Sequence, residues 1–204
     1  MNRNVNDNMV VLLDYERIMI RLGYARSMTP PGNIRSRVNN LILEIRAYIE
    51  PKAVYVDASI EKKFSDYTII EGGLKLPGND VARRLANSYI ATIFAATLGE
   101  EITKQITQRS KDGRTDEAYI LDVIASEAAE ELARTVNRNA FYRARMEGSK
   151  TTGRFSPGYG DLPLEIQQSI LDFTQAEKIG MFTNKLSMIF PRKSVTGVIG
   201  WYEV

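Results

Sequence analysis

The stretch LSMIFPRKSVTGVIGWY, which runs from Leu186 to Tyr202, indicates an antiparallel sheet. Residues 186–190 and 195–202 have the alternation and the β-branched and aromatic content of strands, and Pro191-Arg192-Lys193 interrupts them as a turn. Strands joined by a short turn pair antiparallel. We therefore predict a terminal β-hairpin over 186–202, as part of an antiparallel sheet.

Upstream of this stretch, helical and strand-like patterns come in blocks. Apolar residues recur at helical spacing in long segments, and Asp14 stands where the cap of a first helix belongs. Helices are expected at 15–22, 34–49, 89–98, 100–111 and 116–146, and strands at 53–56, 67–70 and 74–76. This order predicts an α+β fold, an antiparallel sheet flanked by helices, rather than a βαβ array.

The length of 204 residues suits one domain with a sizeable core. Thr29-Pro30-Pro31-Gly32 has the composition of a turn or linker. We divide the chain into an N-terminal helix and linker, 1–31, and a main unit, 32–204, and expect both to form one compact body.

Charge and hydropathy exclude several classes of partner. The 27 basic and 25 acidic side chains leave a net charge of +2, which gives no nucleic-acid footprint. The longest apolar run, 90–98, is too short to span a bilayer, and residues 1–8 lack the apolar core of a signal peptide. We expect a cytoplasmic protein that binds neither nucleic acid nor membrane.

The chain contains no cysteine and no histidine. Thiolate nucleophiles, Cys-ligated metal centres and His-based triads are therefore excluded, and we predict no metal site. The remaining chemistry is binding, or reactivity that a ligand supplies.

Residues 148–163 form a Gly-, Ser-, Thr- and Pro-rich loop that contains RFSPGYGD, from Arg154 to Asp161. Arg154 offers a planar fork of donors for a carboxylate, and Tyr159 offers an aromatic face. Gly158 and Gly160 allow the backbone to approach a ligand closely. The loop fits an amino acid–nucleoside ligand, but composition alone favours a rigid turn in which Arg154 makes an internal salt bridge.

The Arg154-x-x-x-Gly158-Tyr159 pattern resembles the motif of the activation domain of cobalamin-dependent methionine synthase, in its short, free-standing form. Further similarities follow in the same order and cover roughly 90–202: Phe94 to Gly99, Asp122 with Glu130 and Leu132, and Lys185 to Gly200. The matches in the first 90 residues are too loose to align.

The resemblance implies a ligand, S-adenosylmethionine, and a role in reductive methylation of cob(II)alamin. Arg154 would take the methionine carboxylate, and the backbone of Ser156 would meet the adenine beside Gly158. Tyr159 would line the site near the transferred methyl group and is the candidate catalytic residue. Cobalamin would be carried by a partner, a methionine synthase chain, and a one-electron donor such as a flavodoxin would supply the electron.

The sequence departs from the family on the long helix. An ungapped alignment places Ser126 where the long-form domain has a ligand-contacting acid. Glu130 follows one turn later on the same flank, so Ser126 and Glu130 are both candidate binding residues. Solvent exposure of Glu130, paired with Arg134, is the alternative.

Other functions fit less of the sequence. A methyltransferase of the doubly wound kind needs a glycine-rich loop between a strand and a helix, whereas Gly72-Gly73 lies in a predicted hairpin. An accessory subunit of another corrinoid methyltransferase and an interaction module that has lost the ligand both stay open.

Overall fold

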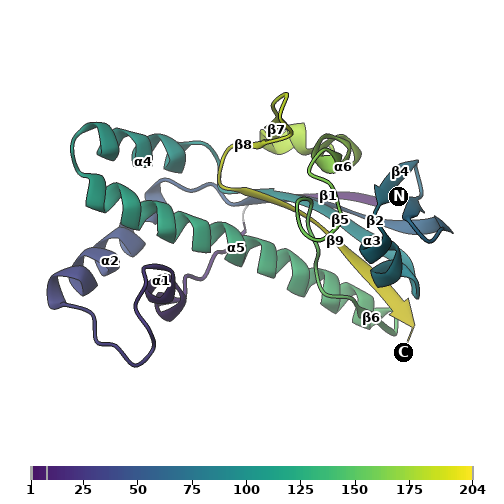
Figure 1. The fold of residues 1–204 in the computed structure, drawn as a ribbon, viewed down its shortest axis with the longest axis horizontal. Helices are drawn as coiled ribbons and strands as arrows, with labels where there is room; N and C mark the ends of the chain where they lie inside the picture. The colour runs from purple at the N-terminus through teal and green to yellow at the C-terminus, as the bar shows by residue number, and fades with distance from the viewer. Residues whose placement is uncertain (1, 8, 204) are drawn as a thin grey trace.

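The computed structural model describes residues 2–7 and 9–203. Its centre is a seven-stranded sheet in the order β4-β3-β2-β5-β9-β6, with β1 beside β2 (Figure 1). Every pairing in this sheet is antiparallel. The strands are β1 (Asn2–Asn6), β2 (Lys52–Lys63), β3 (Tyr67–Ile70), β4 (Leu74–Pro77), β5 (Ser88–Thr97), β6 (Ser149–Thr151) and β9 (Ser194–Glu203).

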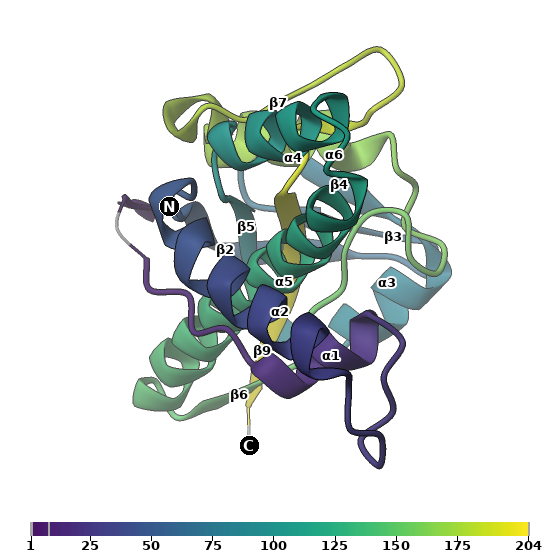
Figure 2. The same cartoon turned by 90° about the vertical axis from the view of Figure 1, so that its left-hand side faces the viewer.

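Helices cover both faces of the sheet. On one face lies the long helix α5 (Thr115–Met146), against which α1 (Tyr15–Arg21), α2 (Gly32–Glu44) and α4 (Glu101–Lys111) pack (Figure 2). The 3-10 helix η1 (Ile45–Ala47) continues α2. The other face carries α6 (Ile166–Thr174), η2 (Ala176–Ile179) and a small sheet of β7 (Phe182–Thr183) and β8 (Ile189–Phe190), and α3 (Asn79–Leu85) follows β4 (Figure 1).

Period-two alternation divides the core between the two faces. Along β5, Phe94 and Ala96 pack in the cluster that includes α5, while Ile93 and Ala95 pack in the clusters on the α6 side. Along β9, Ile199 and Val198 divide in the same way. The central strands are apolar on both sides because helices cover both sides. The α+β fold with an antiparallel sheet is confirmed.

The predicted helix over 89–98 is wrong, because this segment is β5, a central strand. Its residues pair with β2 on one side and β9 on the other. A continuous apolar run of this length fits a buried strand as well as a buried helix, since it has no single apolar face.

The predicted hairpin over 186–202 is also wrong in its pairing. β8 pairs with β7, as Phe182 faces Phe190, whereas β9 pairs with β5 and β6. The turn at Pro191 to Lys193 therefore carries the chain out of one sheet into another. The strand character of the segment is confirmed at 189–190 and 194–203.

Most of the other predicted elements are confirmed. α2 with η1 covers most of the predicted helix at 34–49, and the β3–β4 hairpin occurs as expected. Asp14 caps α1, accepting hydrogen bonds from the backbone N–H groups of Glu16 (2.9 Å) and Arg17 (3.2 Å). Among the helices of the described residues, none combines the length and apolar character needed to cross a membrane.

Candidate functional site

The loop from Arg154 to Asp161 is fixed at both ends. At its start, Phe155 and Val198 of β9 exchange backbone hydrogen bonds of 3.0 and 2.8 Å. At its end, the Asp161 carboxylate accepts a hydrogen bond of 2.8 Å from the backbone N–H of Asp80 in α3. Gly78 permits this approach, since it has a φ of +120° and a Cβ there would lie 2.5 Å from Asp161 Oδ1. These hydrogen bonds hold the loop in a fixed position against β9 and α3.

A cavity of about 720 Å³ opens beside this loop, along the part of β9 that β6 leaves uncovered. This volume is in the range of small-molecule sites. The lining comes from α1 (Arg21), α3 (Arg84), α5 (Glu130, Arg134), the loop (Arg154 to Pro157, and Tyr159), α6 (Gln167), β8 (Ile189) and β9 (Ser194 to Thr196). The layers on both faces of the sheet therefore meet at this site.

Arg154 and Glu130 form an ion pair in the cavity. Arg154 Nη2 lies 2.6 Å from Glu130 Oε1, and the side chains are 22% and 30% exposed, so both are partly open to the cavity. Within the described residues, the buried Nη1 of Arg154 has no acceptor. Arg134 Nη1 lies 3.9 Å from the same Glu130 oxygen. The internal salt bridge expected as the alternative for Arg154 is present, and it lies inside the cavity.

Gly197 of β9 makes room for the aliphatic part of Arg154. A Cβ at Gly197 would lie 3.1 Å from Arg154 Cγ and 2.6 Å from Phe94 Cε1. The Arg154 side chain therefore packs over Gly197, and this close approach requires a residue without a side chain.

The other loop residues differ in how they meet the cavity. Ser156 lines it, and its hydroxyl donates to the backbone carbonyl of Thr196 at 2.7 Å. Tyr159 also lines it, with 77% of the residue exposed, so its ring is free to contact a ligand or partner. Gly158 has a φ of +84° and its N–H donates to the carbonyl of Leu162 at 2.9 Å, so its N–H serves the turn.

Ser126 is not brought to the cavity lining. Its hydroxyl donates to the carbonyl of Asp122 at 2.9 Å and accepts from Lys193 Nζ at 2.8 Å. Lys193 also pairs with the Asp122 carboxylate at 2.8 Å. Of the two candidates on α5, Glu130 alone lines the cavity beside Arg154 and Tyr159.

Arginines that sequence reasoning missed dominate the lining. Arg21, Arg84 and Arg134 join Arg154, whereas Glu130 is the acidic residue of the lining. Burial acts to lower the pKa of Arg134, but its hydrogen bonds to Glu131 and Glu127 outweigh burial, so its pKa lies above its ordinary value. From the sequence, Arg134 was considered only as a neighbour of Glu130 on the helix. No local sequence pattern indicated that Arg21 or Arg84 would line the cavity.

Two buried carboxylates on α5, Glu127 and Glu131, bind the arginines of the lining. Glu127 accepts hydrogen bonds from Arg21 Nε (2.6 Å) and from Arg134 Nη2. Glu131 accepts from Arg134 Nε at 2.7 Å and from Arg138 Nη2 at 3.1 Å. Buried carboxylates need such paired donors, so the network holds the arginines in place.

The protein resembles known proteins in its fold and not in its sequence. No family model matches the sequence, and the search of curated proteins gives no significant match. Among solved structures, the chain is similar to the crystal structure of the MetH reactivation domain bound to AdoHcy, with a TM-score of 0.72 at 12% sequence identity. The alignment covers 98% of this chain and 78% of that chain. The protein has the fold of the MetH reactivation domain.

Proposed function

We propose that this chain binds S-adenosylmethionine in the cavity beside Arg154 and acts as the reactivation component of a cobalamin-dependent methionine synthase. In this role it supports reductive methylation of cob(II)alamin on a partner chain. The MetH domain that shares its fold was crystallised with AdoHcy, the demethylated form of the same ligand. The fold and the cavity together support an adenosyl amino acid as the ligand.

The observation that carries the proposal is the Arg154–Glu130 ion pair within the cavity. A free amino acid presents a carboxylate next to an ammonium group, and an arginine next to a glutamate is the complementary arrangement. The ligand carboxylate would bind the Arg154 guanidinium, which is partly open to the cavity. The ligand ammonium would pair with Glu130.

The rest of the lining suits the nucleoside. The cavity volume of about 720 Å³ accommodates an adenosyl amino acid. Ser156 offers a loop backbone held against β9, and the exposed Tyr159 offers a flat ring at the cavity. By this assignment Arg154 and Glu130 anchor the amino acid, Ser156 meets the adenine, and Tyr159 contacts the region of the methyl group.

Bound S-adenosylmethionine would supply the methyl group and leave as S-adenosylhomocysteine. A one-electron donor such as a flavodoxin would supply the electron, and cobalamin on the partner chain would accept both. The residues of this chain bind and orient the methyl donor. Tyr159 is open to solvent, so its ring also remains accessible to an incoming partner. We expect the protein by itself to methylate nothing, because the proposed methyl acceptor, reduced cobalamin, belongs to the partner chain.

The test combines this chain, S-adenosylmethionine, a one-electron reductant and a cob(II)alamin-loaded methionine synthase that lacks its own activation domain. We expect the absorbance change from cob(II)alamin to methylcobalamin, and we expect it to disappear when the chain or S-adenosylmethionine is omitted. An equal change without the chain, or methylation of a small substrate by the chain alone, would contradict the proposal.

The two remaining functions predict different results. An accessory subunit of another corrinoid methyltransferase would bind the ligand and yet fail to support methionine synthase. An interaction module that has lost the ligand would give no binding heat with S-adenosylmethionine.

A further inference from the structure

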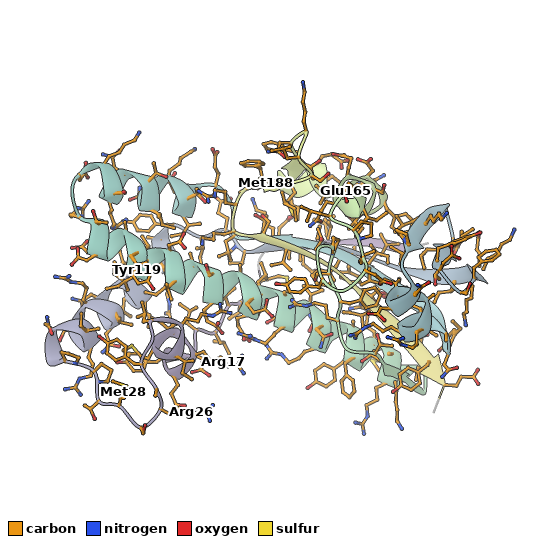
Figure 3. All side chains as sticks on the ribbon, viewed as in Figure 1. Arg17, Arg26, Met28, Tyr119, Glu165 and Met188 are labelled. Carbon is orange, nitrogen blue, oxygen red and sulfur yellow. The ribbon has the colours of Figure 1, made fainter. Side chains whose placement is uncertain are left out.

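Glu127 is a charged residue that the proposed ligand contacts leave unexplained. It lies on α5 with 1% of its surface exposed, and it does not line the cavity. Its carboxylate receives Arg21 Nε at 2.6 Å, Arg134 Nη2 at hydrogen-bond distance and Arg17 Nη1 at 3.9 Å. Arg17 and Arg21 come from α1, which runs beside α5 (Arg17 is labelled in Figure 3).

Two of the arginines held by Glu127 are themselves cavity residues, Arg21 and Arg134. Arg134 is the decisive one, because it competes for Glu130. The Oε1 atom of Glu130 lies 2.6 Å from Arg154 Nη2 and 3.9 Å from Arg134 Nη1. Glu130 thus stands between two guanidinium groups, and it pairs closely with only one.

The positions of the neighbouring carboxylates explain why Glu130 pairs closely with Arg154 and not with Arg134. Arg134 directs Nη2 to Glu127 and Nε to Glu131, which leaves Nη1 as its nearest group to Glu130. A guanidinium that lost one of these partners would have to recover a hydrogen bond, since an unpaired charge in a partly buried position is costly. Glu130, one helical turn before Arg134, is the nearest remaining acceptor.

We propose that Glu127 is a positioning residue of the site: by holding Arg134, it keeps Glu130 beside Arg154 and available to the ligand ammonium. This inference rests on the proposed function, because it assigns the ammonium to Glu130. Helix α1 also contributes to this arrangement, because its Arg21 donates a hydrogen bond to the second carboxylate oxygen of Glu127. Without Glu127, Arg134 pairs closely with Glu130. Arg154 then still binds the ligand carboxylate, but Glu130 no longer binds the ligand ammonium.

The test measures discrimination between two ligands by calorimetry on the full chain. The probes are S-adenosylhomocysteine and its deaminated analogue, in which hydrogen replaces the α-amino group. We expect the wild-type protein to prefer the amino-bearing ligand by roughly tenfold, the size of one charge-assisted hydrogen bond. Glu127→Gln keeps the shape, removes the charge and leaves one acceptor oxygen for Arg21 and Arg134 together. In this variant the preference should fall to about twofold or less.

A double variant separates positioning from simple destabilisation. Glu127→Gln combined with Arg134→Gln removes the competitor for Glu130, so the preference should return toward the wild-type value. General damage to the fold predicts the opposite, a further loss in the double variant. Glu165→Gln is the matched control, an exposed glutamate just before α6 that stays away from α1 (Figure 3); it should behave as the wild-type protein.

If Glu127→Gln does not fold, Glu127→Asp tests the same competition, because it keeps the charge beside Arg21 while its side chain, one methylene shorter, holds Arg134 less closely. In this variant the preference should fall below the wild-type value. An unchanged preference in whichever of Glu127→Gln and Glu127→Asp folds would overturn the inference. Absence of binding by the wild-type protein would instead overturn the proposed function, so the two failures are distinct.

Discussion

Arg154 is the residue on which ligand binding should depend most. Its Nη2 pairs with Glu130 and its Nη1 is buried without an acceptor among the described residues. Arg154→Ala should weaken binding of S-adenosylmethionine by about 2–5 kcal/mol, because it leaves a ligand carboxylate without its partner. Calorimetric titration measures this loss, and Arg192→Ala, at an exposed residue outside the cavity, is the control. Binding near the wild-type level, with the fold intact, would reduce Arg154 to a structural role.

Gly197 should be sensitive to the smallest substitution. In Gly197→Ala, the new Cβ would lie 2.6 Å from Phe94 Cε1 and 3.1 Å from Arg154 Cγ, so the ring or the strand must shift. Overpacking of this kind costs about 1–3 kcal/mol in the free energy of unfolding. Urea denaturation measures the change, and Gly153→Ala, where an added Cβ meets nothing within 4 Å, should have a much smaller effect.

The start of α1 depends on Asp14. Its carboxylate accepts hydrogen bonds from the backbone of Glu16 and Arg17. Asp14→Ala should lower the free energy of unfolding by about 1 kcal/mol, whereas Asp14→Asn keeps an acceptor and should lower it less. Thermal unfolding of the two variants checks this order; equal stability of both with the wild-type protein would show that the cap is dispensable.

Local patterns predicted most elements and failed where pairing over long distance decides. The segment from Ser88 to Thr97 is strand β5 because β2 and β9 flank it, and neither neighbour is visible in its own apolar run. The hairpin over 186–202 failed for the same reason. A strand pattern shows that a segment pairs, but it does not show that Val195 faces Ala96, about a hundred positions away.

The candidate site shows the same division between local and long-range information. A resemblance carried by consecutive residues singled out the loop from Arg154 to Tyr159, and helical spacing after Ser126 singled out Glu130. Glu130 and most of this loop line the cavity. Arg21 and Arg84 were not, because they reach the cavity only through the packing of α1 and α3. Glu127 looks like any solvent-facing helix residue until α1 covers it.

The cavity is lined by residues from α1, α3, α5, α6 and β9. A ligand that touches all of these binds the folded state and not the unfolded chain. At a hundredfold excess over its Kd, S-adenosylhomocysteine should therefore add about 2.7 kcal/mol to the free energy of unfolding. A rise in the thermal midpoint with ligand concentration checks this, and adenine alone, which lacks the amino acid, should have a weaker effect.

We propose that this fold holds a site for S-adenosylmethionine beside Arg154, and calorimetric titration of the full chain measures binding there. We expect saturable single-site binding by the wild-type protein and a large loss of affinity in Arg154→Ala. Absence of binding heat at millimolar S-adenosylmethionine and S-adenosylhomocysteine, or equal binding by the wild-type protein and Arg154→Ala, would contradict it.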